Sequence, residues 1–391
     1  MRNGKEREIK GIYAAVLMVF LVFLLIPILL LLGKSFEGSS GFTLARYGEI
    51  LTGKDFSGVL GRSIWIASIS GVVTTILAFF LAYTIHYTNL PGIWKKVIRL
   101  AAVAPMLLPT ITYGFAIIYS FGKQGLLTRI LGFQLFDIYG FWGLLLGTLA
   151  ASFVQCFFLC FTDYGIPASV GGQYEVVATV LYNEMLGSVP NFNRGAVVAM
   201  MMMVPSVLSI TLLHYLEKYN IRYSRVSQVE LKKNPVRDVC CGAVSFGILL
   251  CVLSSFAVIV IVPAVEEWPY QLSFTWKHVS AVLGDSSLLT VYKNSLLTAG
   301  LTALVGSLVV YGAALVTARS SFGERKKAVI ESIALVTNTI PGMVIGIAFL
   351  FAFSGTPLQN TFFLIVICNV VHFFSTPYLI RREAMPFIRE R

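Results

Sequence analysis

Two cysteines come first among the residues whose type and spacing could support chemistry. Cys156 and Cys160 stand four residues apart, so on a helix they share one face. A thiolate pair can bind a soft metal ion, but such a site needs further ligands, and no His or carboxylate stands nearby. All six cysteines lie in or beside apolar segments, which argues against a disulfide framework. We therefore expect helix packing for both cysteines, and no metal.

A second short motif is similar to the end of a phosphate-binding loop. Gly33, Lys34 and Ser35 match its last positions, but the motif requires a glycine five residues earlier, where Ile28 stands, and a strand before it. The histidines are scattered over different segments and indicate helix ends or packing. They are His86, His214, His278 and His372. No Ser/His/Asp or paired-carboxylate arrangement follows from spacing, so we predict that the chain is not an enzyme.

A carboxylate at the end of an apolar run is the strongest candidate for a functional role. Asp163 is followed by Gly165 and Pro167. A charged group near membrane depth usually faces a cavity or a partner, because lipid exposure costs about 2.5 to 3.5 kcal/mol at the midplane. Asp163 could therefore line a solute path or close an outer gate. The alternative is structural: Asp163 caps the turn where a helix leaves the bilayer, and Gly and Pro form that turn.

Prolines and glycines inside apolar runs suggest hinges and close helix contacts. Proline removes a backbone hydrogen bond within a span, so it is a candidate hinge for alternating access or a static kink. Glycines four residues apart allow helices to approach closely. The hinge candidates are Pro105, Pro109 and Pro341, and the packing candidates are Gly143 with Gly147 and Gly342 with Gly346.

The sequence contains an internal repeat, and several of the residues described above lie within it. When the sequence is shifted by 232 residues, Pro, Gly, Lys and Ser positions coincide without a gap, as well as apolar ones. We interpret the chain as a tandem duplication of one membrane module, a common plan among transporters. Coinciding pairs include Phe42 and Phe274, Ser63 and Ser295, Lys95 and Lys327, Pro109 and Pro341, and Gly114 and Gly346.

The composition indicates an all-α polytopic membrane protein. Of the 391 residues, 57% are hydrophobic and 13% are charged, against about 25% charged in soluble domains. The net charge of +11 comes from short basic clusters between apolar runs, so we expect a lipid bilayer and no nucleic acid as partner. Nine runs are long enough to span a bilayer. They are approximately 12–32, 64–85, 97–121, 139–161, 196–216, 240–263, 295–317, 328–353 and 362–379.

The distribution of Lys and Arg predicts the orientation. The basic N-terminus is expected in the cytoplasm, and so are Lys95, Lys96 and Arg99. Simple alternation over nine spans would then place the most basic segment, 217–239, outside. Moving it to the cytoplasm puts the loop of Glu266 outside and the later basic clusters inside. One crossing is therefore missing between Arg99 and Glu217.

Three stretches resemble a known family. They are Tyr139 to Leu144, Phe161 to Pro167 followed by Gly171 and Gly172, and His372 to Tyr378. They resemble fused, two-module permeases of ATP-binding-cassette importers, in the branch that serves ferric iron, 2-aminoethylphosphonate and related small charged solutes. The resemblance implies a substrate pathway around Asp163, Tyr164, Gly165, Pro167, Gly171 and Gly172.

The sequence also departs from this family. The Glu-Ala-Ala, three residues, Gly pattern of the loop that docks into the ATPase is absent. Near 153–155 one fused run, 139–161, replaces two spans and that loop, which explains the missing crossing. The resemblance thus implies an internally shortened and C-terminally truncated permease, with a first module at 1–216, a basic cytoplasmic linker at 217–239 and a second module at 240–391.

Two functional classes remain open. The first is a permease of the bacterial cytoplasmic membrane, possessing no cofactor of its own, which works with a cytoplasmic ATPase that binds ATP and an external solute-binding protein. The second is a self-sufficient secondary transporter or channel, for which repeats and broken helices are equally natural. Ion-coupled carriers need ionisable residues in mid-span, and the runs here contain few. The first class is therefore favoured; a nonfunctional fragment is the remaining alternative.

Overall fold

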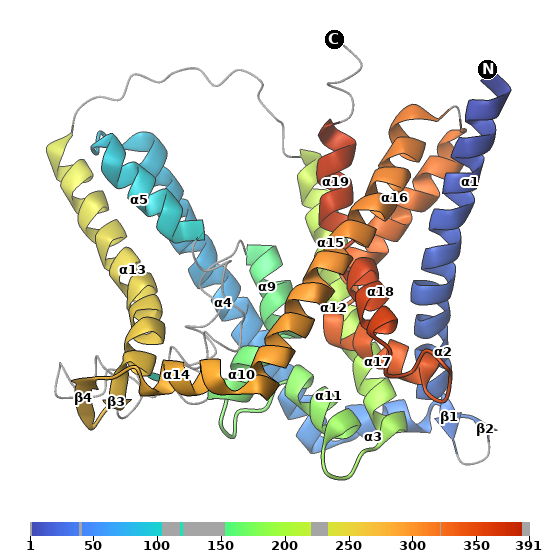
Figure 1. Cartoon of the computed structure of the whole chain (residues 1–391), viewed down its shortest axis with the longest axis horizontal. Coiled ribbons are helices and arrows are strands. Elements are labelled where there is room, and N and C mark those ends of the chain that lie inside the picture. The colour runs from blue at the N-terminus through green and yellow to red at the C-terminus, as the bar shows by residue number, and fades with distance from the viewer. Residues whose placement is uncertain are drawn as a thin grey trace. The chain divides into compact units, whose positions relative to one another are not determined.

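The computed structural model describes residues 2–38, 41–103, 118–119, 153–219, 234–320 and 322–384. Among these, helices dominate, accompanied by two small two-stranded antiparallel sheets, and the predicted all-α membrane fold is confirmed (Figure 1). The chain divides into two compact units, and both draw on distant parts of the sequence. Unit 1 comprises Met1–Ile50, Leu181–Val207 and Asp285–Arg391, and unit 2 comprises Leu51–Val180 and Leu208–Gly284. The predicted module boundaries remain a prediction.

Unit 1 is built around the first and last helices of the chain. In its core α1 packs against α15 and α2 packs against α17. The rings of Phe20 and Phe374 lie 4.5 Å apart, and both side chains are buried. Its elements are α1 (Arg2–Phe20), η1 (Leu21–Leu25), α2 (Ile26–Ser35), β1 (Glu37–Gly38), β2 (Gly41–Phe42), most of α3 (Ala45–Thr52), the start of α12 (Phe192–Tyr219), α15 (Ser286–Arg319), α16 (Glu324–Thr339), α17 (Gly342–Phe353), α18 (Phe362–His372) and α19 (Ser375–Ala384).

Unit 2 is built around α4, along which α9 packs. Ile66 and Ala67 of α4 and Phe161 of α9 are buried. On another side α13 packs against α4 and α5, and the rings of Trp94 and Phe246 lie 6.0 Å apart. Its elements are α4 (Lys54–Tyr87), α5 (Gly92–Val103), α9 (Phe153–Thr162), α10 (Gly165–Val170), the start of α11 (Val177–Leu186), α13 (Pro235–Ile261), η3 (Val262–Ala264), β3 (Val265–Glu267), β4 (Gln271–Phe274) and α14 (Lys277–Gly284).

Local sequence explains where the long helices begin. Asn234 precedes α13, its side chain accepts the N–H of Arg237 at 3.2 Å, and Pro235 occupies the first helical position. Asp285 caps α15 in the same way, accepting the N–H of Ser287 at 2.8 Å. Such side chains satisfy donors that have no partner within the helix.

The bounds of several elements recur at the spacing of the sequence repeat. Adding 232 to the bounds of α3 gives those of α14, and adding 232 to the bounds of α4 gives those of α15. In the same way α5 begins at Gly92 and α16 at Glu324. The duplication thus predicts where these helices start, and in the first two pairs also where they end.

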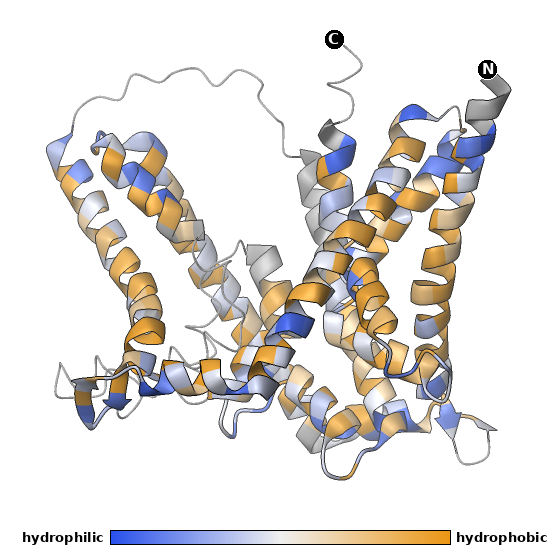
Figure 2. Ribbon diagram, viewed as in Figure 1, coloured by the Kyte–Doolittle hydropathy of each residue, from blue (hydrophilic) through white to orange (hydrophobic). Residues whose placement is uncertain are grey.

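Four described helices are long and apolar enough to cross a membrane. They are Arg7–Ser35, Phe56–Tyr87, Pro235–Ala264 and Ser286–Arg319, and each contains a predicted span. Figure 2 shows hydrophobic residues along most of their length. The predicted run 196–216 lies within α12, whose apolar part is Phe192–Leu208. Most of runs 97–121 and 139–161 lies outside the described residues.

Two predicted spans are bent pairs of helices rather than single helices. Run 328–353 comprises α16 and α17, which meet at 104°, and run 362–379 comprises α18 and α19, which meet at 51°. The first break falls at Pro341, which cannot donate a backbone hydrogen bond and so ends a helix readily. Counting each bent pair as one span, the described part of the chain has up to six.

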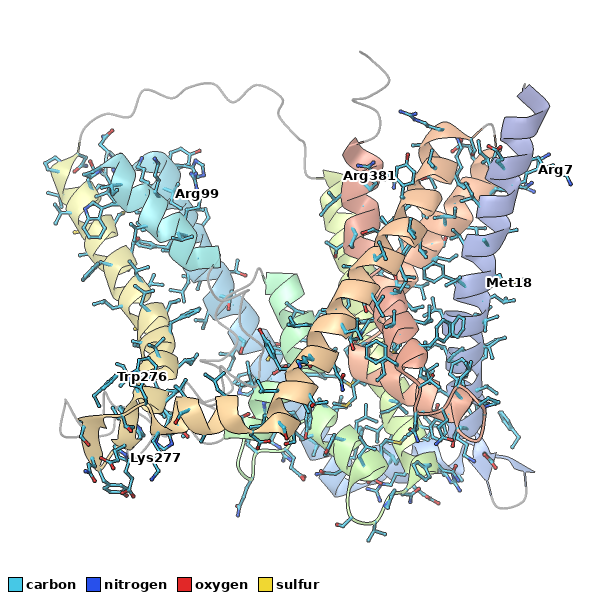
Figure 3. All side chains as sticks on the ribbon, in the orientation of Figure 1. Arg7, Met18, Arg99, Trp276, Lys277 and Arg381 are labelled. Atoms are coloured by element: carbon cyan, nitrogen blue, oxygen red, sulfur yellow. The ribbon has the colours of Figure 1, made fainter. Side chains whose placement is uncertain are left out.

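Basic clusters gather at one end of each unit considered by itself. In unit 1, Arg7 and Arg381 lie at the same end, as the labelled side chains in Figure 3 show. In unit 2, Arg99 lies at the end opposite to Trp276 and Lys277. This arrangement agrees with the grouping predicted from charge. The side of the membrane that each end faces remains a prediction.

Candidate functional site

Asp163 holds the turn between α9 and α10. Its Oδ2 accepts the backbone N–H of Ile166 at 2.9 Å, in the first turn of α10. Asp163 and Tyr164 are half-buried, whereas Gly165 and Pro167 are buried. The structure therefore shows the capping contact expected in the structural alternative for Asp163. A role of these residues in a solute path remains a prediction.

The two glycines after α10 form a second tight turn. The N–H of Gly171 donates to the carbonyl of Pro167 at 2.8 Å, and its own carbonyl accepts the N–H of Tyr174 at 2.8 Å. A Cβ at Gly171 would lie 2.4 Å from the Pro167 carbonyl oxygen, and Gly172 has a φ of +56°. Both conditions favour glycine. The stretch from Asp163 to Gly172 is thus a turn-rich connection between α9 and α11.

An arginine and a serine of α4 hold this connection. The Arg62 Nε donates to the carbonyl of Glu175 at 3.2 Å, and its guanidinium carbon lies 5.6 Å from the ring centre of Tyr174. Ser63 is fully buried; its Oγ accepts the N–H of Val177 at 2.9 Å and donates to the carbonyl of Val59 at 2.9 Å. A cation from α4 and an aromatic ring from the loop thus lie next to each other, and the ring follows shortly after Gly171 and Gly172 in the sequence.

Partial burial and a nearby positive charge act on the ionisation of Tyr174. Burial raises the pKa of the Tyr174 phenol, and the positive charge of Arg62 opposes the shift. Tyr174 therefore remains a neutral hydrogen-bonding group at physiological pH. Sequence reasoning missed Arg62 and Tyr174, since they are 112 positions apart, whereas Ser63 was visible as a repeat pair with Ser295.

The hinge candidate Pro341 lies at a contact between two helix breaks. It caps α17, and a Cβ built on the next residue, Gly342, would lie 3.1 Å from Cε1 and Nε2 of His372, where α18 ends. A side chain thus lies close to Gly342, whereas Gly346 is exposed and has none of the described atoms within 4 Å of a built Cβ. The role of both glycines in close helix packing stays a prediction. Pro105, Pro109, Gly143 and Gly147 lie outside the described residues.

A metal centre does not form among the residues that the structure describes. No group of three or more His, Cys, Asp or Glu side chains there could hold an ion. The Cys160 thiol instead lies 4.0 Å from the Ser70 hydroxyl, within the contact between α9 and α4. Cys160 thus packs between helices.

These features define an all-α, multi-pass membrane protein with broken helices and a turn-rich connection beside α4. Two curated proteins are similar to it. The putative ferric transport system permease protein FbpB 1 of Haemophilus influenzae is 22% identical over 426 residues, covering 92% of this chain and 66% of that protein. The ferric transport system permease protein FbpB of Actinobacillus pleuropneumoniae is 22% identical over 428 residues, covering 92% and 61%.

The chain therefore spans less than two thirds of the length of each of these relatives. No protein-family model matches it, and no solved structure does. The similarity nevertheless extends over 92% of this chain.

Proposed function

We propose that this chain is the membrane permease subunit of an ATP-driven importer of ferric iron. The observation that carries the proposal is the similarity to two ferric transport permeases over 92% of the chain. Ferric iron is the first candidate solute, because both relatives are named for ferric transport. The second candidate solute is 2-aminoethylphosphonate.

The described spans support a permease that draws its energy from a partner. In the four long candidate spans, Asp, Glu, Lys and Arg occur near the ends only, as with Arg62, Asp238 and Lys293. A self-sufficient ion-coupled carrier would need such groups at mid-span. The proposed partners are a cytoplasmic ATP-binding-cassette ATPase, which binds the ATP, and an external solute-binding protein. The proposed location is the bacterial cytoplasmic membrane, with a cytoplasmic N-terminus.

The solute is tested on the binding protein encoded beside this chain. We expect the purified protein to bind ferric ion, measured by calorimetry and by the visible absorbance of the bound iron, and 2-aminoethylphosphonate not to compete. Binding of sugars or peptides alone would overturn the proposal. Binding of 2-aminoethylphosphonate alone would replace ferric iron by the second solute.

The role of Asp163 is tested in an intact relative. Residues 153–186 replace the aligned segment of the Haemophilus influenzae permease, and uptake of radioactive ferric iron is measured in cells that lack their own permease. Asp163→Asn keeps an oxygen that can cap α10 but removes the charge. Reduced uptake at an unchanged membrane level would support a role in the path, and unchanged uptake would remove Asp163 from it.

A further inference from the structure

A short hairpin and a short helix of unit 2 follow directly after a membrane span. Strands β3 and β4 and helix α14 occupy residues 265–284, between the candidate spans Pro235–Ala264 and Ser286–Arg319. Helix α14 contacts η3 at the end of α13, and Figure 1 shows it running across the direction of α13 rather than along it. The segment therefore begins where the chain leaves the bilayer and does not continue the span.

The hairpin has a polar face and an apolar face. On the polar face, Oε2 of Glu266 accepts hydrogen bonds from Nε2 of Gln271 at 3.1 Å and from Oγ of Ser273 at 3.0 Å. Leu272 and Phe274 alternate with these two residues along β4, so they lie on the other face. Both are large, apolar and exposed.

The apolar face continues into the start of α14. The ring centre of Trp276 lies 5.4 Å from that of Phe274, and Val279 and Leu283 follow Trp276 at helical spacing. Figure 3 shows Trp276 on the side of this segment nearer to the length of α13 and Lys277 on the far side. A tryptophan toward the span and a lysine away from it are typical of a membrane–water interface.

The first repeat exposes large apolar side chains at the same positions. There β1, β2 and α3 lie between the candidate spans Arg7–Ser35 and Phe56–Tyr87. Water alone gives no reason for this agreement, because exposed apolar surface is unfavourable in water. The matched exposed fractions are 78% for Phe42 and 69% for Phe274, 61% for Leu44 and 64% for Trp276, and 51% for Leu51 and 63% for Leu283.

We infer that the two segments 37–52 and 265–284 are lipid anchors, whose exposed apolar side chains insert in the headgroup region of the bilayer. An amphipathic segment that lies in this region buries its apolar face about 5 to 10 Å into the boundary between headgroups and acyl chains. For segment 265–284 this is the bilayer surface opposite to Arg99. The inference goes beyond the proposed function and does not depend on which solute is carried.

The depth of β4 in the bilayer tests the inference. The full chain, in which the six native cysteines are replaced, carries Phe274→Cys or, as the matched control on the polar face of the same strand, Ser273→Cys. Phe42→Cys provides the counterpart in the first repeat. Each cysteine is labelled with bimane, and the protein is reconstituted in vesicles. Quenching is measured with lipid brominated near the headgroup and with iodide in the water.

We expect at least about twofold more quenching by brominated lipid at position 274 than at 273, and the reverse order with iodide, because an interfacial segment holds its two faces at different depths. Position 42 should behave like position 274. Equal lipid quenching at 274 and 273 would overturn the inference. Protection of position 274 from iodide without quenching by lipid would also overturn it, and would indicate that protein covers this face.

Tryptophan fluorescence provides a second measurement that leaves the native cysteines in place. Trp276→Phe keeps an apolar ring, and we expect it to reduce the fraction of the intrinsic fluorescence that the same brominated lipid quenches. An unchanged quenched fraction would place Trp276 away from the headgroup region and refute the anchor at 265–284.

Discussion

At the scale of single residues, two serines that match in the repeat, Ser63 and Ser295, should differ in how much they stabilise the fold. Ser63 is buried and accepts the N–H of Val177, whereas Ser295 is exposed and bonds within its own helix. Ser63→Ala leaves a buried N–H without an acceptor, so we expect a loss of about 1 to 3 kcal/mol in the free energy of unfolding. The measurement is unfolding of the purified protein by SDS in mixed micelles.

Ser295→Ala is the matched control and should change this free energy by less than about 0.5 kcal/mol. Equal effects of both substitutions would contradict the packing of α4 against the loop before α11. The distinction was not visible in the sequence, where both serines stand in similar apolar runs.

Glycines 342 and 346 make a second residue-scale pair. Gly342→Ala brings a Cβ within 3.1 Å of the His372 ring, so that ring must shift, and we expect a loss of about 1 kcal/mol. Gly346→Ala meets nothing among the described atoms within 4 Å and should be neutral or stabilising by up to about 1 kcal/mol, because alanine favours helix. Thermal unfolding in detergent measures both. The reverse order of stability would refute the contact between the two helix breaks.

At the scale of elements, the start of α15 should depend on pH. Hydrogen bonds from the Ser287 hydroxyl and from the N–H groups of Ser287 and Leu288 lower the pKa of Asp285 in the folded state. Because the folded pKa is lower than the unfolded value of about 3.9, this cap stabilises above that value. The contribution is lost as pH falls through the folded pKa.

We therefore expect the first turn of α15 to exchange its amide hydrogens faster, relative to the intrinsic rate, below about pH 4. Asp285→Asn keeps a capping oxygen that does not titrate, so it should remove this pH dependence. Hydrogen exchange read by mass spectrometry measures both proteins. An unchanged acid response in Asp285→Asn would show that another group is responsible.

The sequence predicted elements better than it predicted their geometry. The 232-residue repeat and the caps at Asn234 and Asp285 account for where α13, α14 and α15 start. Run 328–353 was expected as one span because its hydrophobicity continues across Pro341, yet the helices meet there at 104°. A continuous hydrophobic run indicates that residues lie in the membrane, but it does not indicate the direction in which the helix runs. The contact of Arg62 with Tyr174 depends on tertiary packing, which spacing alone does not encode.

At the scale of the whole molecule, the proposed partnership with an ATPase requires a loop that docks into it. The docking-loop pattern of the permease family that the sequence resembles does not occur in these 391 residues. A partner shifts a conformational equilibrium only through contacts that differ between the two states. We therefore expect these 391 residues by themselves to insert in the membrane without assembling stably with the ATPase that we propose as partner.

Affinity purification of tagged chain, followed by ATPase assays in proteoliposomes with the ferric-loaded binding protein, measures this coupling. We expect neither co-purification nor stimulated hydrolysis. If both occur, another cytoplasmic segment must make the contact, and segment 217–239 is the first candidate.

Membrane topology provides the most direct test of the central claim, a multi-pass permease whose basic clusters face the cytoplasm. In a chain without native cysteines, Cys replaces Ser227, in the basic segment outside the described residues, or Ser280, which is exposed on α14. Intact cells are treated with a membrane-impermeant thiol reagent, and broken cells show that both sites can react. We predict labelling of intact cells at position 280 and protection at 227. Labelling at 227 with protection at 280 would contradict the account.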